Sequence, residues 1–382
     1  MFIFQIVIVL IATKLAGHLS VRLGQPSVLG KILIGIIIGP AMLGWVTDND
    51  VMQAFSQIGV ILLMFLAGLE TDLEELNANM KAAVFVAIGG VILPIAMSYP
   101  LALAFGLTQG QAIFVGLTLA ATSVSISVQT LNEIGWLKSK EGSVLLGAAV
   151  LDDIIVVVML AIAMSFLLGD DVSIPALIGG KVFFFVLLFV VAKYVIPPFL
   201  KMFSRLKVTE ALLSGALVAC FAMAYVGEHY FGIATIIGAF FMGIAIGRTE
   251  FKETVEHKVE PLASSLFVPF FFVSIGLSVT FDGITENIWF LVVFSIVAIF
   301  SKLIGSGLGA KLAGFNWRAS AGIGSGMVSR GEVALILAAM GLSSGLLPAE
   351  DYTPMVIVII VTTLVTPPML KGIFGERDHH HS

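Results

Sequence analysis

Charged residues are scarce in this sequence of 382 residues: Lys, Arg, Asp and Glu make up 12% of it, whereas 58% of the residues are hydrophobic. The mean hydropathy is +1.07. A chain so poor in charge has no soluble basic surface, which excludes nucleic-acid binding. A soluble core accounts poorly for so much apolar sequence. The composition is therefore typical of a polytopic membrane protein.

Cysteine and clustered metal ligands are also lacking. Cys220 is the single cysteine, so an intramolecular disulfide is excluded. His18, His229 and His257 stand alone without ligand spacing, which argues against a resident metal site. No set of a nucleophile and a base emerges either, so an enzyme is the class of function that we favour least.

Two further signals are absent. No GxGxxG pattern lies between a strand and a helix, so we expect no nucleotide-binding domain in this chain. The N-terminus has no basic segment and no small-residue cleavage site, so we expect the first apolar stretch to be a retained helix and not a signal peptide. The tail 376–382 carries a histidine run that is typical of an expression vector.

Long apolar stretches dominate what is present. A helix needs about 20 apolar residues to cross a bilayer. About thirteen stretches of this kind, separated by short polar breaks, predict an all-α protein with about thirteen transmembrane helices. These stretches are 2–22, 27–45, 53–70, 81–105, 110–133, 142–169, 174–200, 208–230, 232–248, 260–280, 286–314, 318–345 and 352–374.

Positive charges fall almost entirely on one side of the predicted membrane. The even-numbered loops carry only acidic charges, and Lys181 at the start of the seventh stretch is a mild exception. The odd-numbered loops and the tail carry Arg22, Lys81, Lys138, Lys140, Lys201, Arg205, Lys207, Arg248, Lys252, Lys258, Lys311, Arg318, Lys371 and Arg377. Because basic loops stay in the cytoplasm, we expect the N-terminus outside and the C-terminus inside. The mixed charges from Arg248 to Glu260 are interpreted as a solvated loop.

An internal repeat relates the two halves of the chain. VLGKILIGIIIG at 28–39 aligns with IIGAFFMGIAIG at 236–247, an offset of 208 residues. The same offset aligns Gly68 with Gly276. It equates stretches 1–6 with 8–13 and leaves the seventh as a linker. Seven is an odd number of passes, so the second half enters the membrane inverted, as in secondary transporters.

The same offset pairs the two least regular apolar segments, LAATSVSISVQTL at 119–131 and MVSRGEVALILAA at 327–339. Both are predicted to be interrupted helices, because hydroxyl side chains in the first and glycines in the second tolerate a broken backbone. Irregular backbone at membrane depth persists only where protein buries it or where it lines a wet cavity. Paired breaks in corresponding positions of two halves predict a transport site.

Asp152 and Asp153 lie side by side in the middle of an apolar stretch. One Asp at the centre of a membrane helix costs about 2.5 to 3.5 kcal/mol, so two cost roughly 5 to 7 before a partner is counted. Carboxylates with hydroxyls and free carbonyls are ligands for a hard cation such as Na⁺. Adjacent carboxylates also repel, so we expect the pair to bind a proton as a coupled unit. Proton and cation then compete for the same oxygens.

Three other ionisable residues lie at membrane depth. Lys302 is an isolated cation on the eleventh stretch and is the expected partner of Asp152, either in a permanent bridge or in one that the transported ion breaks. Adjacent residues differ by about 100° around a helix, so one carboxylate can face an ion cavity while the other turns towards a partner helix. Arg330 and Glu332 are expected to tie the second interrupted helix to its neighbours.

These motifs resemble the monovalent cation:proton antiporter-2 family, in particular its short bacterial Na⁺/H⁺ antiporters of the NapA and GerN type. The matching segments run in family order over nearly the whole chain. They are QPSVLGKILIGIIIGPAMLG, LLMFLAGLETDL, LAATSVSISVQTL, VLDDIIVV, GAFFMGIAIG, PFFFVSIGLSV, SKLIGSGLG and SRGEVALI. One departure is Lys31, where many relatives have Glu.

The resemblance implies a homodimer in the membrane, in contact with lipids, with a mobile core that moves like an elevator. It implies that Asp153 is the essential ion ligand, that Asp152 pairs with Lys302, and that Thr122 and Ser123 belong to the crossing of the interrupted helices. The implied parts are a dimer domain at 1–80 and 206–283, a core transport domain at 81–172 and 284–375, a linker helix at 173–205 and the tail at 376–382.

The function implied is exchange of Na⁺, and of Li⁺ or K⁺ as alternatives, for H⁺ across the cytoplasmic membrane, with no cofactor. Two other interpretations stay open at this point. A K⁺/H⁺ antiporter or K⁺ efflux pathway is one, although the efflux relatives usually show Gln–Asp in place of Asp152–Asp153. A Na⁺-coupled symporter for an organic solute is the other, and it would need a larger polar pocket.

Overall fold

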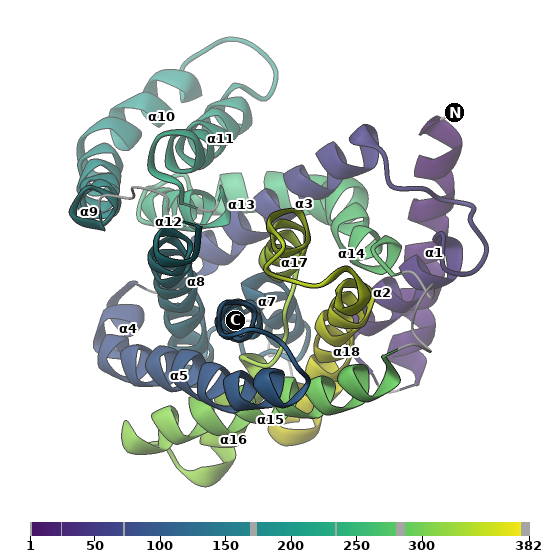
Figure 1. The fold of residues 1–382 in the computed structure, drawn as a ribbon. Coiled ribbons are helices and arrows are strands. Elements are labelled where there is room, and N and C mark those ends of the chain that lie inside the picture. Colours follow the sequence, from purple (N-terminus) through teal and green to yellow (C-terminus); the bar gives the residue numbers. More distant parts are fainter. Residues whose placement is uncertain are drawn as a thin grey trace. The chain divides into compact units, whose positions relative to one another are not determined.

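The computed structural model describes residues 2–23, 25–71, 73–168, 174–233, 235–279 and 287–375. All regular elements in these ranges are helices (Figure 1). Ten of them are long and apolar enough to cross a membrane, and three shorter apolar helices accompany them. A helix satisfies its backbone hydrogen bonds internally, which is what spanning a bilayer requires. The chain is therefore a multi-pass membrane protein.

The chain folds into two compact units, each built from separate segments. Unit 1 contains 1–49, 75–170 and 272–382, and unit 2 contains 50–74 and 171–271. The helices of unit 1 are α1 (Phe2–Arg22), α2 (Ser27–Ile38), α5 (Met80–Ala104), α6 (Gln109–Ala120), α7 (Val124–Glu133), α8 (Lys140–Leu168), α15 (Ile288–Leu312), α16 (Trp317–Gly326), α17 (Glu332–Ser344) and α18 (Ala349–Phe374).

Unit 2 contains two π-helical turns within its longer helices. Its elements are α3 (Asp50–Glu70), α9 (Ile174–Val190), η1 (Val191–Val195), α10 (Ile196–Ser204), α11 (Ala211–Phe231), α12 (Thr235–Gly247), α13 (Lys252–Leu262) and η2 (Ala263–Phe267). Two further helices cross the boundaries between the units, α4 (Leu73–Ala78) and α14 (Val268–Leu277).

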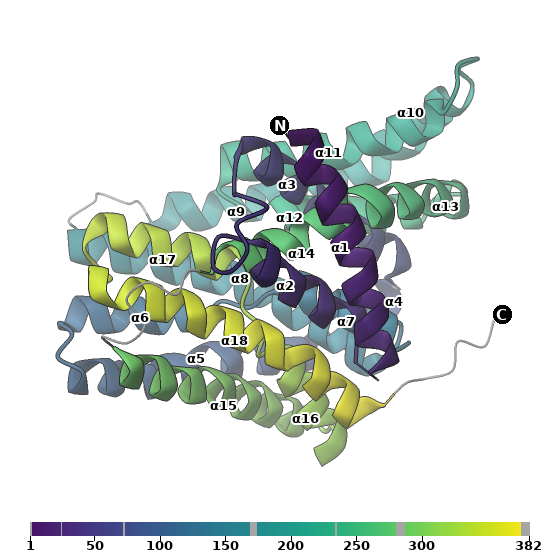
Figure 2. The same ribbon diagram turned by 90° about the vertical axis from the view of Figure 1, so that its right-hand side faces the viewer.

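Unit 1 is built around α5 and α15, which pack along each other (Figure 1). Helix α18 also runs alongside α15, as Figure 2 shows. Glycines allow the close approach of α5 and α15: a Cβ on Gly305 would lie 2.9 Å from Leu93 Cβ and against the backbone of Gly89. Small residues at such contacts let membrane helices approach closely enough for dispersion to hold them together.

The aligned glycines of the two halves make matching contacts. A Cβ on Gly30 would meet the carbonyl carbon of Ala16 at 2.8 Å, where α1 packs on α2. Gly238 lies 208 residues later, and a Cβ there would meet Cα of Ala224 at 3.0 Å, where α11 packs on α12. Ala224 is likewise 208 residues after Ala16. The same small-residue contact therefore occurs once in each half.

A second pair of contacts follows the same offset. A Cβ on Gly35 would lie 3.2 Å from Cα of Gly276, within unit 1. A Cβ on Gly243 would lie 2.9 Å from Cα of Gly68, within unit 2. Gly243 lies 208 residues after Gly35, and Gly276 lies 208 residues after Gly68. The offset therefore relates the first contact to the second.

The interpretation of the segment from Arg248 to Glu260 as a solvated loop is wrong in part. Helix α13 begins at Lys252 and runs to Leu262 through the polar run KETVEHKVE. Charges of opposite sign four residues apart, as in Lys252 and Glu256, support a helix. Val255 and Val259 share one face of this helix and are buried. Their packing therefore stabilises the helix in addition to the charge pairs.

Candidate functional site

The candidate site lies in unit 1, where two helices are interrupted. Helix α6 ends at Ala120 and α7 begins at Val124, and Ala121 and Ser123 on either side of Thr122 have extended backbone angles. Helix α16 ends at Gly326 and α17 begins at Glu332. Both breaks fall inside the two segments predicted to be interrupted. The side chain of Glu332 is outside the part of the chain that the structure describes.

The two breaks satisfy each other's backbone groups. The amide of Ser123 donates to the carbonyl of Ser329 at 2.7 Å, and the Ser329 hydroxyl donates back to the carbonyl of Ser123 at 3.0 Å. The hydroxyl of Ser127 donates to the carbonyl of Gly326. Gly331 makes room for this crossing, because a Cβ there would lie 2.6 Å from Ser123 Oγ. These bonds replace the helical ones that the breaks remove.

The guanidinium of Arg330 donates hydrogen bonds to backbone carbonyls. It is fully buried, and its Nε and one terminal nitrogen donate to the carbonyl of Leu119 at 2.8 and 2.6 Å. It also donates to the carbonyls of Val328 and Ala298, both at 2.9 Å. Leu119 lies in the last turn of α6, where helical carbonyls have no partner and the macrodipole is negative. A fixed cation with several donors suits that helix end.

Asp152 is held by two side chains from outside its own helix. Its Oδ2 lies 2.8 Å from the ammonium nitrogen of Lys302 on α15 and accepts a hydrogen bond from the Thr122 hydroxyl in the first break. Lys302 also donates to Thr122 at 2.6 Å. The side chains of Asp152 and Lys302 are fully buried. A buried pair with this geometry offsets part of the cost of removing both charges from water.

Asp153 is in a different environment from its neighbour. Its side chain is 3% exposed, and neither carboxylate oxygen has a hydrogen-bond partner within the described ranges. Oδ1 of Asp152 also has none there. Buried polar atoms are normally paired, so an unpaired carboxylate calls for a ligand, water or a proton. The two adjacent carboxylates thus have different surroundings, since one is paired with Lys302 and the other has no partner in the described part of the chain.

The formal charges of the described site cancel when Asp153 is ionised. Asp152 and Asp153 are then balanced by Lys302 and Arg330, all of them buried. Either a monovalent cation or a proton on Asp153 leaves the same net charge of plus one at the site. One small cation and one proton are therefore equivalent in the charge that they add to the site.

Several residues of the site were not predicted as such from the sequence. Ser329 and Thr363 belong here, because the Thr363 hydroxyl donates to the carbonyl of Arg330 in the second break. Ser306 lies one turn after Lys302, is buried, and its oxygen has no hydrogen-bond partner among the described residues. Gly90 leaves room for this pair, because a Cβ there would clash with the Ser306 hydroxyl oxygen and touch the Lys302 nitrogen at 3.5 Å. Hydroxyl residues in apolar helices were the available signal.

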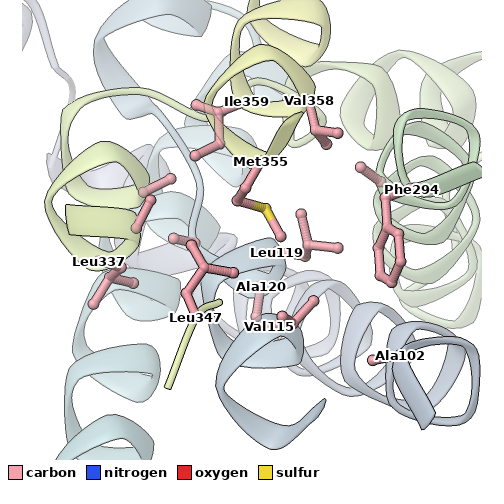
Figure 3. Packing of buried hydrophobic residues seen from close by; sticks show 14 of the residues in the cluster. Ala102, Val115, Leu119, Ala120, Phe294, Leu337, Leu347, Met355, Val358 and Ile359 are labelled. Carbon is pink, nitrogen blue, oxygen red and sulfur yellow. The ribbon is translucent and has the colours of Figure 1, made fainter. Parts of the chain in front are cut away.

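An apolar cluster closes one side of the crossing. Figure 3 shows Leu119 and Ala120 at the end of α6 facing Met355 and Ile359 of α18, with Leu337 of α17 nearby. These residues are at most 4% exposed. Leu119 therefore joins the two features, since its carbonyl binds Arg330 while its side chain belongs to the cluster. Water and ions are excluded from the site on this side.

Known proteins resemble this chain over its whole length. A family model described as "Sodium/hydrogen exchanger, transmembrane" matches residues 6–374. The Na(+)/H(+)-K(+) antiporter GerN of Bacillus cereus is 56% identical over 99% of this chain and 97% of its own length. A Na(+)/H(+) antiporter of Enterococcus hirae is 42% identical over 97% of both chains.

A solved structure has a similar fold. The sodium proton antiporter MjNhaP1 of Methanocaldococcus jannaschii aligns with a TM-score of 0.67 at 15% identity, covering 98% of this chain and 96% of that one. The similarity in sequence and fold extends over both interrupted helices and the helix that carries the paired carboxylates. The chain belongs to the sodium/hydrogen exchanger family and is a secondary transporter, a cation:proton antiporter, not an enzyme.

Proposed function

We propose that this chain exchanges Na⁺ for H⁺ across the cytoplasmic membrane and that Asp153 binds the two ions in turn. The observation that carries the proposal is the buried carboxylate of Asp153, which has no hydrogen-bond partner among the described residues, beside a second carboxylate already paired with Lys302. Competition for one carboxylate couples the two fluxes, because a carrier loaded with one ion cannot carry the other. Thr122 and Ser123 would contribute oxygens near the crossing.

K⁺ is the second candidate cation. GerN, which is 56% identical to this chain, is named as a Na(+)/H(+)-K(+) antiporter. A site built from carboxylate and carbonyl oxygens can accept more than one alkali cation, and cavity size and ligand number then set the preference. Li⁺ is included for the same reason. Whether Lys302 or Asp152 also releases a proton decides whether the exchange moves net charge.

We further propose that the fold consists of two inverted six-helix repeats joined by a linker helix, with thirteen membrane passes. The matching contacts of Gly30 with Ala16 and of Gly238 with Ala224 support this, because one offset relates both partners. The exchanged pairs Gly35–Gly276 and Gly243–Gly68 support it in the same way. The three shorter apolar helices would complete the thirteen passes.

The division into dimer, linker and core domains that we propose is the one that the family resemblance implies. A homodimer in the membrane would hold residues 1–80 and 206–283 still, while 81–172 and 284–375 carry the ion by an elevator movement. The tail and residues 169–173, where the proposed core domain meets the linker, lie outside the described ranges. With basic loops inside, the N-terminus would face outward and the apolar cluster around Leu119 would lie on the outer side. This conformation would then be closed to the outside.

The test is cation-dependent proton movement in proteoliposomes. The purified protein is reconstituted with a pH-sensitive dye and an imposed proton gradient, and Na⁺, Li⁺, K⁺ or choline chloride is added. Wild-type protein should give a saturable signal with Na⁺, and Asp153→Asn should abolish it while leaving the protein folded. Asp351→Asn is the matched control, because Asp351 is also a buried carboxylate of unit 1 but binds Asn287 at 2.8 Å, apart from the site.

The possible results separate the candidates. A signal with Na⁺ that only Asp153→Asn removes supports exchange at this carboxylate. A signal with K⁺ and none with Na⁺ supports the alternative function, K⁺/H⁺ exchange. Proton movement that survives in Asp153→Asn places the ion elsewhere and contradicts the proposal.

A further inference from the structure

Glu133, the last residue of α7, binds the first turn of α2. Its carboxylate accepts a hydrogen bond from the Ser27 amide at 2.6 Å and a second from the Ser27 hydroxyl. Lys31 of α2 lies 3.9 Å from the same carboxylate, and Gln129 of α7 donates to it at 3.2 Å. These contacts join residues that are 106 positions apart in the sequence.

The carboxylate does for α2 what a capping residue normally does. The N-cap position of α2 is Pro26, whose side chain makes no capping hydrogen bond. The first amides of a helix need acceptors, and a negative charge there is favoured by the macrodipole. Glu133 supplies both functions from another helix. Hydrogen bonds to a charged group are stronger than neutral ones.

The pair of Glu133 and Lys31 is only partly solvated. The two side chains are 20% and 17% exposed, and the Lys31 nitrogen lies 5.6 Å from the centre of the Phe272 ring. Water and salt therefore screen this pair less than a pair on an open surface. The contact between α2 and α7 thus consists of short hydrogen bonds from Ser27 to a charged acceptor and one longer ion pair.

Helix α7 connects this contact to the ion site. It runs without interruption from Val124, directly after the first break, to Glu133. A helix of ten residues is about 15 Å long and moves as a rigid rod. Any displacement of Thr122 and Ser123 with α7 must therefore displace Glu133 from Ser27, or carry α2 along.

We propose that Glu133, Ser27 and Lys31 form a latch that holds α7 against α2 in this conformation and opens once in every transport cycle. The inference rests on the proposed function, in which α2 belongs to the static domain and α7 to the mobile core. Glu133 acts through α7 and is a positioning residue for the ion site. The latch sets how much of the protein occupies this conformation.

Cross-linking tests whether the two helices part. Ser27→Cys and Glu133→Cys are introduced together in a Cys220→Ser background, and a short, reducible bifunctional thiol reagent joins them. We expect the cross-linked protein to exchange ions at less than about a tenth of the rate measured after the cross-link is cleaved with reductant. Each single cysteine variant treated with the same reagent is the control. If the cross-linked protein transports as fast as the protein whose cross-link has been cleaved, α2 and α7 move together and the latch proposal is overturned.

Kinetics and hydrogen exchange test the stabilising role. Glu133→Gln should raise both the maximal rate and the apparent KM for Na⁺ at the side to which this conformation opens, because the latched state becomes less populated. A shift of about tenfold in that population corresponds to about 1.4 kcal/mol. Glu141→Gln, on the first turn of α8, is the control and should change neither value. A fall in maximal rate with an unchanged KM would indicate a purely structural role.

Hydrogen–deuterium exchange separates failure of the latch from failure of the proposed function, since it requires no transport. The amides of Ser27 to Lys31 should exchange about tenfold faster in Glu133→Gln than in Glu141→Gln. Equal exchange in the two variants would refute the latch even if the protein transports Na⁺. If these amides exchange hydrogen faster in Glu133→Gln but the wild-type protein transports no cation, the contact is supported and the proposed function is contradicted.

Discussion

Two adjacent residues of identical chemistry have opposite surroundings in this protein. Asp152 has Lys302 at 2.8 Å and the Thr122 hydroxyl, whereas Asp153 has no partner within the described ranges. The difference follows from helix geometry, because consecutive side chains point about 100° apart. One carboxylate therefore faces α15 and is neutralised. The other keeps its oxygens for an ion.

We predict that removing Lys302 destabilises the protein by about 3 to 5 kcal/mol, because Asp152 would be left as an unpaired buried charge. Lys302→Met should lower the unfolding temperature in detergent, measured by the intrinsic tryptophan signal. Asp152→Asn in the Lys302→Met background should recover most of the loss.

The control for this prediction is Lys311→Met on the same helix. Lys311 donates to the carbonyl of Phe315 at 3.2 Å near the end of α15, lies 5.0 Å from the centre of the Trp317 ring, and forms no ion pair within the described ranges. It should change stability little. A double variant as unstable as Lys302→Met alone would mean that the lysine acts through packing and not through its charge.

Close helix contacts dominate at the scale of elements. Helices α3 and α12 meet at Gly68 and Gly243, where a side chain on either would strike backbone of the other. In a membrane, helices are held by such packing because lipid offers no hydrophobic penalty for separation. Glycine is therefore needed at these positions for space and not for backbone flexibility.

We predict that Gly68→Ala destabilises unit 2 by about 1 to 3 kcal/mol, the usual cost of overpacking. Its Cβ would press on the carbonyl of Phe240 and lie 3.0 Å from Cα of Gly243. Gly179→Ala is the matched change, because nothing lies within 4 Å of a Cβ there. It should be neutral or slightly stabilising in its helix. Equal unfolding temperatures for the two variants would contradict the packing argument.

Sequence patterns predicted the elements with uneven success. The interruptions between 119 and 131 and between 327 and 339 were predicted because Ser and Gly residues leave a strong local signal. The helix from Lys252 to Leu262 was missed, because its polar surface masks the two buried valines that make it pack. Its exact limits depend on tertiary contacts, as helix ends generally do.

At the scale of the whole molecule, the one-sided distribution of Lys and Arg should set the orientation in the membrane. We predict that a membrane-impermeant thiol reagent applied to intact cells labels Glu350→Cys and not Lys207→Cys, in a Cys220→Ser background. Both positions are exposed, whereas Cys220 is buried. Permeabilised cells should label both variants. Labelling of Lys207→Cys in intact cells would reverse the orientation.

The sequence by itself determined the membrane class of this protein, the approximate position of its apolar helices, its two interruptions and the residues of the family motifs. These properties are local, because apolar length, charge and small residues act within a few turns of the chain. The pair of Lys302 and Asp152 was expected because isolated charges at membrane depth need partners, but the tertiary structure alone decided the other polar contacts. Glu133 reaches Ser27 across 106 residues, and Arg330 reaches the carbonyl of Leu119 across 211. No periodicity encodes such partners, since the direction of each side chain depends on how whole helices pack against one another.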